Sequence, residues 1–166
     1  MKIAIIADLH DQLMNLDKFL KYCLKNKIKK ILCLGDVTSE ETISYFARNF
    51  SGDIFLVRGN AELYDEKILE EFPNIKNCQE IASKKFGQLN IIFFHEPEKL
   101  KKAPLDKIKA DFVFYGHTHK PWLEKKENYF FVNPGNLGGL YYDASFAVLD
   151  TKTKDLKLKI IHRIED

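Results

Sequence analysis

The first half of the chain alternates short, almost continuous apolar runs with segments whose apolar residues recur at helical spacing. The runs are KIAIIA at residues 2–7, KILCLG at 30–35 and DIFLVRG at 53–59. Runs of this length and continuity are typical of strands buried on both faces of a sheet. Between the first two runs, apolar side chains share one helix face: Leu13, Leu16, Leu20, Cys23 and Leu24. The pattern predicts alternating strands and helices.

Two further helices are predicted from capping and breaking residues. Thr38 and Glu41 have the spacing of a capping box, which predicts a helix through residues 39–50. A third helix is expected between about Glu62 and Phe72, because the following Pro73 disfavours helical backbone in the residue before it.

Hairpins dominate the second half of the chain. Two strands are predicted within residues 80–95 around Gly87, and another at residues 111–116. A hairpin at residues 121–135 should turn near Glu127, and a last one at 145–164 should turn through residues 151–154. Early alternation followed by hairpins indicates two packed sheets covered by helices, an α/β sandwich. A length of 166 residues suits one domain, and we expect it to span residues 1–166.

Charge and cysteine content narrow the class of protein. The net charge of +2 gives no strong attraction to nucleic acid or acidic membranes. No apolar run approaches the roughly 20 residues needed to span a bilayer, and the start lacks the pattern of a signal peptide. Cys23 and Cys33 are expected to be small core residues, and with Cys78 they do not form a disulfide framework. These features favour a cytoplasmic protein without membrane association.

Polar residues follow the ends of five predicted strands. They are Asp8 and His10, Asp36, Asn60, His95, and His117 with His119. In α/β sheets, ligands bind outside the carboxyl ends of the strands, so residues distant in sequence can converge there. Members of the two close pairs are two residues apart and would point the same way in an extended segment. The glycines before several of these residues, Gly35, Gly59 and Gly116, allow sharp bends or close backbone approach.

The side-chain types indicate a metal site. Two carboxylates, one amide and four imidazoles, with no thiolate, suit Mn, Fe, Zn, Ni or Co better than Ca. Seven ligands are too many for one transition ion, and they serve two if one carboxylate bridges. Hydrolytic two-metal sites hold ions roughly 3.5–4 Å apart. The sequence therefore predicts a dinuclear metal site.

Each of these residues also has an ordinary structural interpretation. Asp8 and Asp36 could cap the helices that follow them, and Asn60 could be a turn residue after Gly59. His117 and His119 could be ordinary half-buried histidines. The joint pattern favours metal ligands over these separate explanations.

Residues beside the predicted site allow similar alternatives. Arg58 could contact phosphate, although pairing with an acidic side chain is more common. Trp122 and the pair Tyr141-Tyr142 could form the wall of a substrate pocket or cover the sheet edge. His162 is expected to be structural or exposed in the last strand.

Together these motifs resemble those of the calcineurin-like metallophosphoesterases: Asp8-Leu9-His10, Gly35-Asp36, Gly59-Asn60, His95 and Gly116-His117-Thr118-His119. The small size and the segment Asn133-Pro134-Gly135-Asn136 resemble the compact bacterial and archaeal phosphodiesterases of that superfamily. The resemblance runs from Ile3 to about Val148. It implies a four-layer α/β/β/α sandwich with two mixed central sheets and outer helices.

The resemblance also implies a role for each ligand. Asp8, His10 and His119 would hold a first metal, and Asn60, His95 and His117 a second, with Asp36 as the bridge. Asp36, Asn60, His10 and His117 are the implied catalytic residues. The implied reaction is attack on the phosphorus of a small phosphate ester by a hydroxide that bridges two divalent ions. Manganese is the first expectation for these ions, with Ni, Fe, Zn and Co as alternatives.

The chain departs from the family pattern at two positions. Many members have histidine directly after the Gly-Asn motif, where this chain has Ala61 and then Glu62, so the general acid is unassigned. After His95, the chain has Glu96 and Pro97, and this extra carboxylate could repel an anionic substrate or bind another partner.

The sequence is compatible with three functions. The first is a metal-dependent phosphodiesterase acting on small diesters. A nuclease using the same chemistry ranks lower, because the chain is short and its charge nearly balanced. The third is a non-catalytic interaction scaffold like the endosomal coat subunit of the same superfamily, which this chain's complete ligand set disfavours. Exposed strand edges in the second-half hairpins could support a homodimer.

Overall fold

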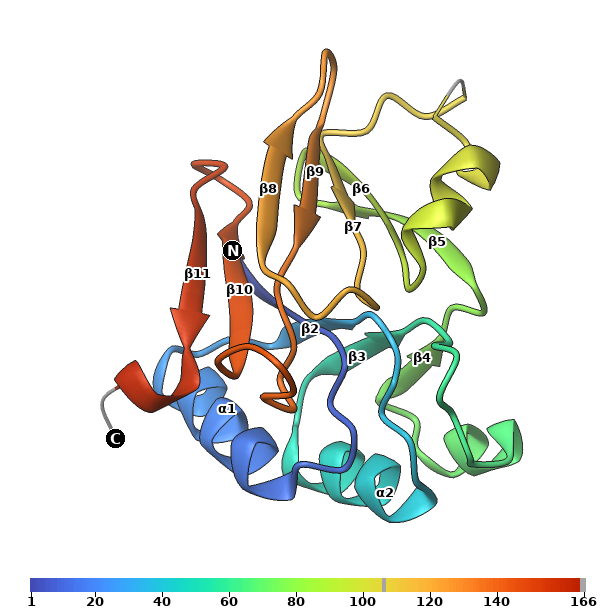
Figure 1. Ribbon diagram of the computed structural model, residues 1–166, viewed down its shortest axis with the longest axis vertical. Coiled ribbons are helices and arrows are strands. Elements are labelled where there is room, and N and C mark those ends of the chain that lie inside the picture. The colour runs from blue at the N-terminus through green and yellow to red at the C-terminus, as the bar shows by residue number, and fades with distance from the viewer. Residues whose placement is uncertain (106, 165–166) are drawn as a thin grey trace.

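The computed structural model describes residues 1–105 and 107–164, and within them the strands form two mixed sheets (Figure 1). The first sheet has the order β11-β10-β1-β2-β3-β4, with β11 at Leu156–Ile160, β10 at Ser145–Asp150, β1 at Lys2–Ile6, β2 at Lys30–Cys33, β3 at Asp53–Leu56 and β4 at Ile75–Asn77. The second has the order β5-β6-β7-β9-β8, with β5 at Ile81–Phe86, β6 at Leu89–Phe94, β7 at Phe112–Phe114, β9 at Phe130–Asn133 and β8 at Trp122–Lys125.

Strand direction brings the ends of several strands to one edge. In the first sheet, β1, β2, β3 and β4 are parallel, β10 runs antiparallel to β1, and β11 runs antiparallel to β10. In the second, β6, β7 and β9 are parallel, and the outer strands β5 and β8 are antiparallel to their neighbours. The carboxyl ends of the parallel strands therefore meet at a common edge of each sheet.

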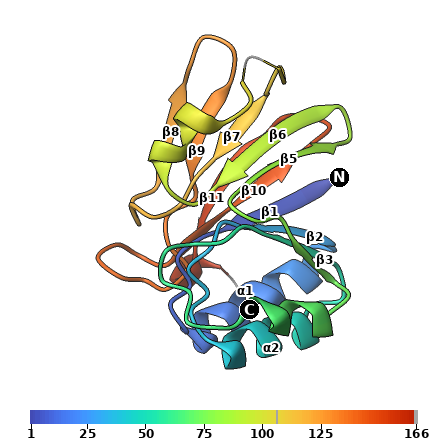
Figure 2. The same ribbon diagram turned by 90° about the vertical axis from the view of Figure 1, so that its right-hand side faces the viewer.

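Both faces of the first sheet are buried, which explains its continuous apolar runs. Helices α1 (Leu13–Lys25) and α2 (Glu40–Asn49) cover one face, and the second sheet covers the other (Figure 2). Along β1, Ala4 and Ile6 pack in the core under the helices, whereas Ile3 and Ile5 pack between the sheets. Since side chains alternate along a strand, a strand between two cores must be apolar at every position.

The outer face of the second sheet has a thinner cover. A 3-10 helix, η2 (Pro97–Lys102), and the segment that follows it pack against this face. Ile92 and Phe94 of β6 form a third core there with Leu100 and Ile108. The predicted fold class, α/β with two mixed central sheets, is confirmed, and the outer layer on this side is a 3-10 helix with irregular chain.

Some predicted elements were wrong in detail. The cap of α2 is Ser39, whose hydroxyl accepts the backbone N–H of Thr42 at 3.2 Å, whereas Thr38 has a left-handed backbone with φ 88°. The third helix is a shorter 3-10 helix, η1 (Glu66–Glu71), and β4 follows it without having been predicted. His162 lies in the 3-10 helix η3 (Ile161–Arg163) and not in the last strand.

The remaining predicted helices and strands are present. The first helix and the three predicted hairpins form, and Cys23 and Cys33 are buried core residues. In the part of the chain described, every helix is too short or too polar to cross a membrane.

Candidate metal centre

Three of the predicted ligands, Asp8, Asp36 and His95, form a buried floor. The side chains of Asp8 and His95 are 0% exposed. His95 Nε2 lies 3.2 Å from Asp36 Oδ2 and 3.9 Å from Asp8 Oδ1. On the other side of the ring, His95 Nδ1 lies 2.7 Å from the carbonyl oxygen of Leu34. Because a carbonyl only accepts, Nδ1 carries a proton, and Nε2 faces the carboxylates.

The remaining predicted ligands, His10, Asn60, His117 and His119, form a more open rim. His10 Nε2 and His119 Nε2 are 3.2 Å apart, and His119 Nε2 is 3.5 Å from Asp8 Oδ1. Asn60 Oδ1 lies 2.8 Å from His117 Nδ1 and 2.9 Å from His95 Nε2. Asn60 and His117 are exposed, so the site opens to solvent on their side.

The ligand atoms fall into two overlapping groups. Asp8, His10 and His119 can converge on one ion, as can Asp8, Asp36 and His95. Asp8 belongs to both groups, and Asp36 Oδ2 lies 3.8 Å from His10 Nε2 of the first group and 3.2 Å from His95 Nε2 of its own group. Ligand atoms bound at about 2.0–2.1 Å from one ion lie roughly 3–3.4 Å from each other. The shorter of these separations therefore fit the edges of metal coordination polyhedra.

The floor needs a positive charge. Burial raises the pKa of Asp8 to about 7, although His95 opposes the shift, and neighbouring Asp36 adds to it. Burial is the largest influence on Asp36 and would raise its pKa, but the hydrogen bond and charge interaction with His95, together with the backbone N–H of Ala61, lower the pKa overall. The same contact raises the pKa of His95 against the effect of burial. Oxygen atoms thus surround His95 Nε2, and a proton or a metal ion must lie among them. The donor set fits divalent transition ions.

The backbone at the ligands corrects one sequence prediction. The pairs two residues apart do not lie in extended segments. Asp8, His10, Asp36, His117 and His119 all have left-handed backbone, with φ from 46° to 66°. Each such residue costs roughly 1–2 kcal/mol without glycine's freedom. Backbone hydrogen bonds retain the conformation, including those from the N–H groups of Leu9 and His10 to the carbonyl oxygen of Asp36 at 2.9 and 3.0 Å.

Glycine is required where the second and third strand-end loops meet, as predicted. A Cβ on Gly59 would lie 2.1 Å from Asp36 Oδ1 and 2.4 Å from the backbone nitrogen of Asp36. Gly35 has φ +96°, and its Cβ would lie 2.5 Å from the nitrogen of Gly59. Side chains at these positions would push Asp36 out of place.

Glu62 organises these same two loops, a role that sequence reasoning missed. Its carboxylate accepts backbone N–H bonds from Asp36 at 2.7 Å, Val37 at 3.1 Å, Thr38 at 2.9 Å and Gly59 at 3.1 Å. These bonds keep the start of residues 62–72 out of a helix. The available signal was a carboxylate two residues after the Gly59-Asn60 motif, in a segment assigned to helix.

Two asparagines position the loop that carries His117 and His119. Asn133 Nδ2 donates to the carbonyl oxygen of Gly116 and to Thr118 Oγ1, both at 2.9 Å. Asn136 Nδ2 donates to the carbonyl oxygen of His119 at 3.1 Å. The motif noted at residues 133–136 therefore supports the site without supplying a ligand.

Residues beside the site separate into those that contact it and those that do not. Arg58 pairs with Glu66, the more common of its predicted alternatives. Glu96 lies 3.4 Å from Lys99 Nζ, which offsets the extra negative charge beside His95. The ring of Tyr141 is 5.8 Å from that of His119, whereas Trp122 lies on the edge strand β8.

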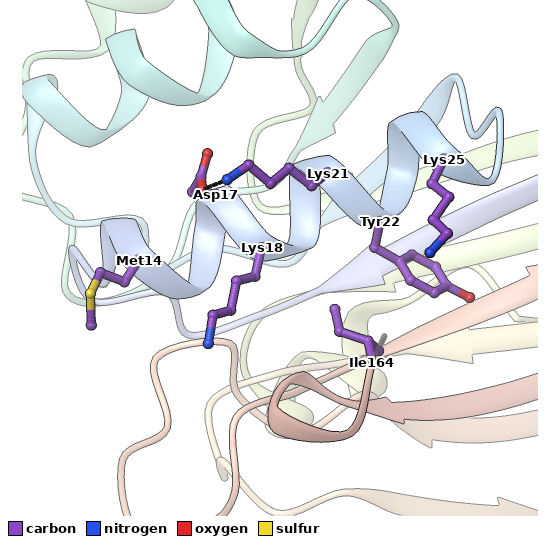
Figure 3. A pocket seen from close by; sticks show the side chains of 7 residues that line it. All are labelled: Met14, Asp17, Lys18, Lys21, Tyr22, Lys25 and Ile164. Carbon is purple, nitrogen blue, oxygen red and sulfur yellow. Dashed lines mark ion pairs between the residues drawn. The ribbon is translucent and has the colours of Figure 1, made fainter. Parts of the chain in front are cut away.

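A cavity away from the metal ligands lies along α1. Its volume is about 400 Å³, and Figure 3 shows its lining: Met14, Asp17, Lys18, Lys21, Tyr22, Lys25 and Ile164. Asp17 bonds Lys21 at 2.7 Å within this lining. None of the seven predicted ligands borders it, so we assign it no part in the chemistry.

The fold and the strand-end cluster together define a metallophosphatase-type protein. A family model described as "Calcineurin-like phosphoesterase superfamily domain" matches residues 1–154. The chain therefore belongs to the calcineurin-like phosphoesterase superfamily, as its motifs indicated.

Individual relatives come from both enzymatic and trafficking proteins. The chain is 28% identical over 173 residues to phosphodiesterase MJ0936 of Methanocaldococcus jannaschii, covering 95% of this chain and 97% of that protein. It is 29% identical over 145 residues to vacuolar protein sorting-associated protein 29 of Schizosaccharomyces pombe, covering 84% and 73%. A solved archaeal phosphodiesterase structure has the same fold, with TM-score 0.86, 24% identity and coverage of 96% and 99%.

Proposed function

We propose that this protein is a metal-dependent phosphodiesterase with a dinuclear centre. The observation that carries the proposal is that five of the predicted ligands form two groups sharing Asp8, and that Asn60 and His117 adjoin the second group through His95. Family membership supports phosphoester hydrolysis, and the similarity to a protein named as a phosphodiesterase favours diesters.

We assign the ligands by their contacts. Asp8, His10 and His119 would hold a first ion, and Asn60, His95 and His117 would hold a second. Asp36 would be shared by the two ions, because its Oδ2 lies near both His10 and His95. Manganese is the proposed ion, and Ni, Fe, Zn and Co suit the same donor set.

The two ions, when bound, would activate water as the nucleophile and neutralise charge on the phosphoryl oxygens. The chain's own residues fix the geometry of that reaction. Asp36 contacts both His10 and His95 from the buried side, and the exposed Asn60 and His117 lie on the solvent-open side, from which a phosphate would approach. Preorganised charges of this kind stabilise a transition state better than mobile ones.

We assign no side chain as the acid that would protonate the leaving group. Position 61 is alanine, whose backbone N–H donates to Asp36 Oδ1 at 2.8 Å, and neighbouring Glu62 is engaged with backbone N–H groups. With no acid assigned there, diesters with acidic leaving groups should react best.

The proposal is tested by hydrolysis of bis-p-nitrophenyl phosphate with chelator-stripped protein, with and without Mn, Ni or Zn, beside p-nitrophenyl phosphate. We expect metal-dependent turnover that is faster for the diester than for the monoester. Absence of turnover with every metal, in protein that binds two ions, would contradict the proposal.

That negative result would favour an interaction scaffold, the second candidate. The specific observation for it is an apolar surface between β8 and β11, where Trp122, Leu123 and Leu158 are exposed around a cavity of about 190 Å³. The similarity to a vacuolar protein sorting-associated protein points in the same direction. Complete retention of the ligand set favours the enzyme.

The proposed function also includes a substrate class, a domain organisation, a cellular location and an oligomeric state. We propose a small phosphate ester as substrate in preference to nucleic acid, and one domain over residues 1–166 in a cytoplasmic protein. The continuous core between the two sheets supports the single domain. A homodimer through the edges of the second-half hairpins stays a prediction, which light scattering of the purified protein would test.

A further inference from the structure

Tyr141 lies beside the proposed centre without being one of its ligands. Its ring centroid is 5.8 Å from that of His119, and the two ring planes are inclined by 42°. The residue is 92% exposed, so nearly all of the ring remains available for contact. Aromatic rings pair in offset or tilted arrangements with centroids about 4.5–7 Å apart. Tyr141 therefore sits within pairing distance of a histidine that borders the phosphate position.

The loop that carries Tyr141 is tied to the ligand loop. Asn136 uses both ends of its amide, accepting the N–H of Leu140 at 2.6 Å and donating to the carbonyl oxygen of His119 at 3.1 Å. In Figure 2, β1 runs from the labelled N-terminus at the right toward the left of the view. The β9–β10 loop, drawn in orange, extends on the left, the side toward which β1 runs. One side chain thus fixes the tyrosine loop relative to the metal site.

The backbone of Tyr141 is an outlier. Its φ is 67°, close to the 75° of Gly139 two residues earlier. Glycine adopts this region freely, whereas a tyrosine there is disfavoured. Residues with such disfavoured backbone cluster at functional sites, which is consistent with a functional role for the side chain of Tyr141.

We propose that Tyr141 is a stacking platform for a planar aromatic group esterified to the phosphate, so that the site prefers aryl over alkyl phosphate esters. The ester oxygen separates ring and phosphorus by two bonds, so a ring on a phosphate beside His119 reaches Tyr141. This inference rests on the proposed function, because it takes the phosphate to lie at the metal ligands. Stacking on an exposed ring adds affinity for any planar group and requires no hydrogen bond.

Calorimetric binding of two phosphate monoesters to the manganese-loaded protein tests this proposal. Phenyl phosphate carries a planar ring, and cyclohexyl phosphate carries a ring of similar bulk that cannot stack. We expect phenyl phosphate to bind about tenfold more tightly than cyclohexyl phosphate, within the range for aromatic stacking. Tyr141→Ala should reduce the ratio of affinities to about one, with cyclohexyl phosphate binding unchanged.

Two control variants separate stacking from structure. Tyr141→Phe keeps the ring and should keep the preference, and so should Tyr142→Ala, which removes the neighbouring tyrosine. The proposal is overturned if Tyr141→Ala retains the preference, if wild type has none, or if wild type binds neither compound.

The outcome is independent of turnover. A protein that prefers phenyl phosphate through Tyr141 and hydrolyses no diester would refute the phosphodiesterase proposal alone. A protein that hydrolyses diesters and shows no such preference would refute the role of Tyr141 alone.

Discussion

The buried floor and the open rim of the candidate centre are built differently. Asp8, Asp36 and His95 in the floor lie under the strand ends, and His95 is fixed on its far side by the carbonyl oxygen of Leu34. In the rim, Asn60 and His117 are exposed and contact each other through one pair of atoms, Oδ1 and Nδ1. The difference suggests that the floor sets metal affinity, whereas the rim exchanges contacts with substrate.

The largest effect is expected from alanine substitutions that compare the two regions. His95→Ala should weaken the second ion by at least about 100-fold, because it also leaves the buried Asp36 carboxylate without its partner. His117→Ala should weaken the same ion less, since water can replace an exposed ligand. Calorimetric manganese titration measures both. Equal losses of manganese affinity in the two variants would show that floor and rim ligands contribute alike to metal binding.

A smaller effect is expected at Glu62, which supports the floor without touching an ion. Glu62→Gln preserves the size of the side chain but replaces the carboxylate that accepts hydrogen bonds from the N–H groups of Asp36, Thr38 and Gly59 with an uncharged amide. We expect metal affinity to fall about 10–100-fold, the usual cost of losing a supporting contact. Glu66→Gln, which affects only exposed contacts with Arg58 and Asn77, is the matched control. Unchanged affinity in Glu62→Gln would show that the loops hold Asp36 without it.

The smallest effect is expected where an asparagine supports the rim. Asn133→Ala removes bonds to the carbonyl oxygen of Gly116 and to Thr118 Oγ1, and we expect about a tenfold loss of diester hydrolysis. Asn128→Ala, in the turn between β8 and β9, should leave hydrolysis unchanged. A loss in Asn133→Ala larger than in His95→Ala would mean that loop position matters more than the floor.

Features encoded by local pattern were predictable from the sequence. The apolar runs of β1 and β2 specify strands with two buried faces, and parallel strands carry the residues at their ends to one edge. Asp8 and Asp36 follow such runs directly, so their convergence followed from topology. The motif set added the assignment of ligands to each ion.

Features that depend on distant contacts were not predictable. The left-handed backbone of Asp8 and His117 is retained by hydrogen bonds between loops, and the residue type alone does not predict it at either position. Glu62 looked like a helical residue because three of its four partners lie about 25 residues earlier in the chain. Strand β4 has only three residues, too few to show an alternating pattern.

The most direct test of the account is the manganese stoichiometry and affinity of Asp36→Asn beside wild type, measured by calorimetry. The substitution keeps the shape of the side chain and removes the charge that faces both ligand groups. We predict two ions per wild-type chain and weaker binding of both ions in the variant. Two ions bound by Asp36→Asn as tightly as by wild type would contradict the bridging role and, with it, the dinuclear centre proposed here.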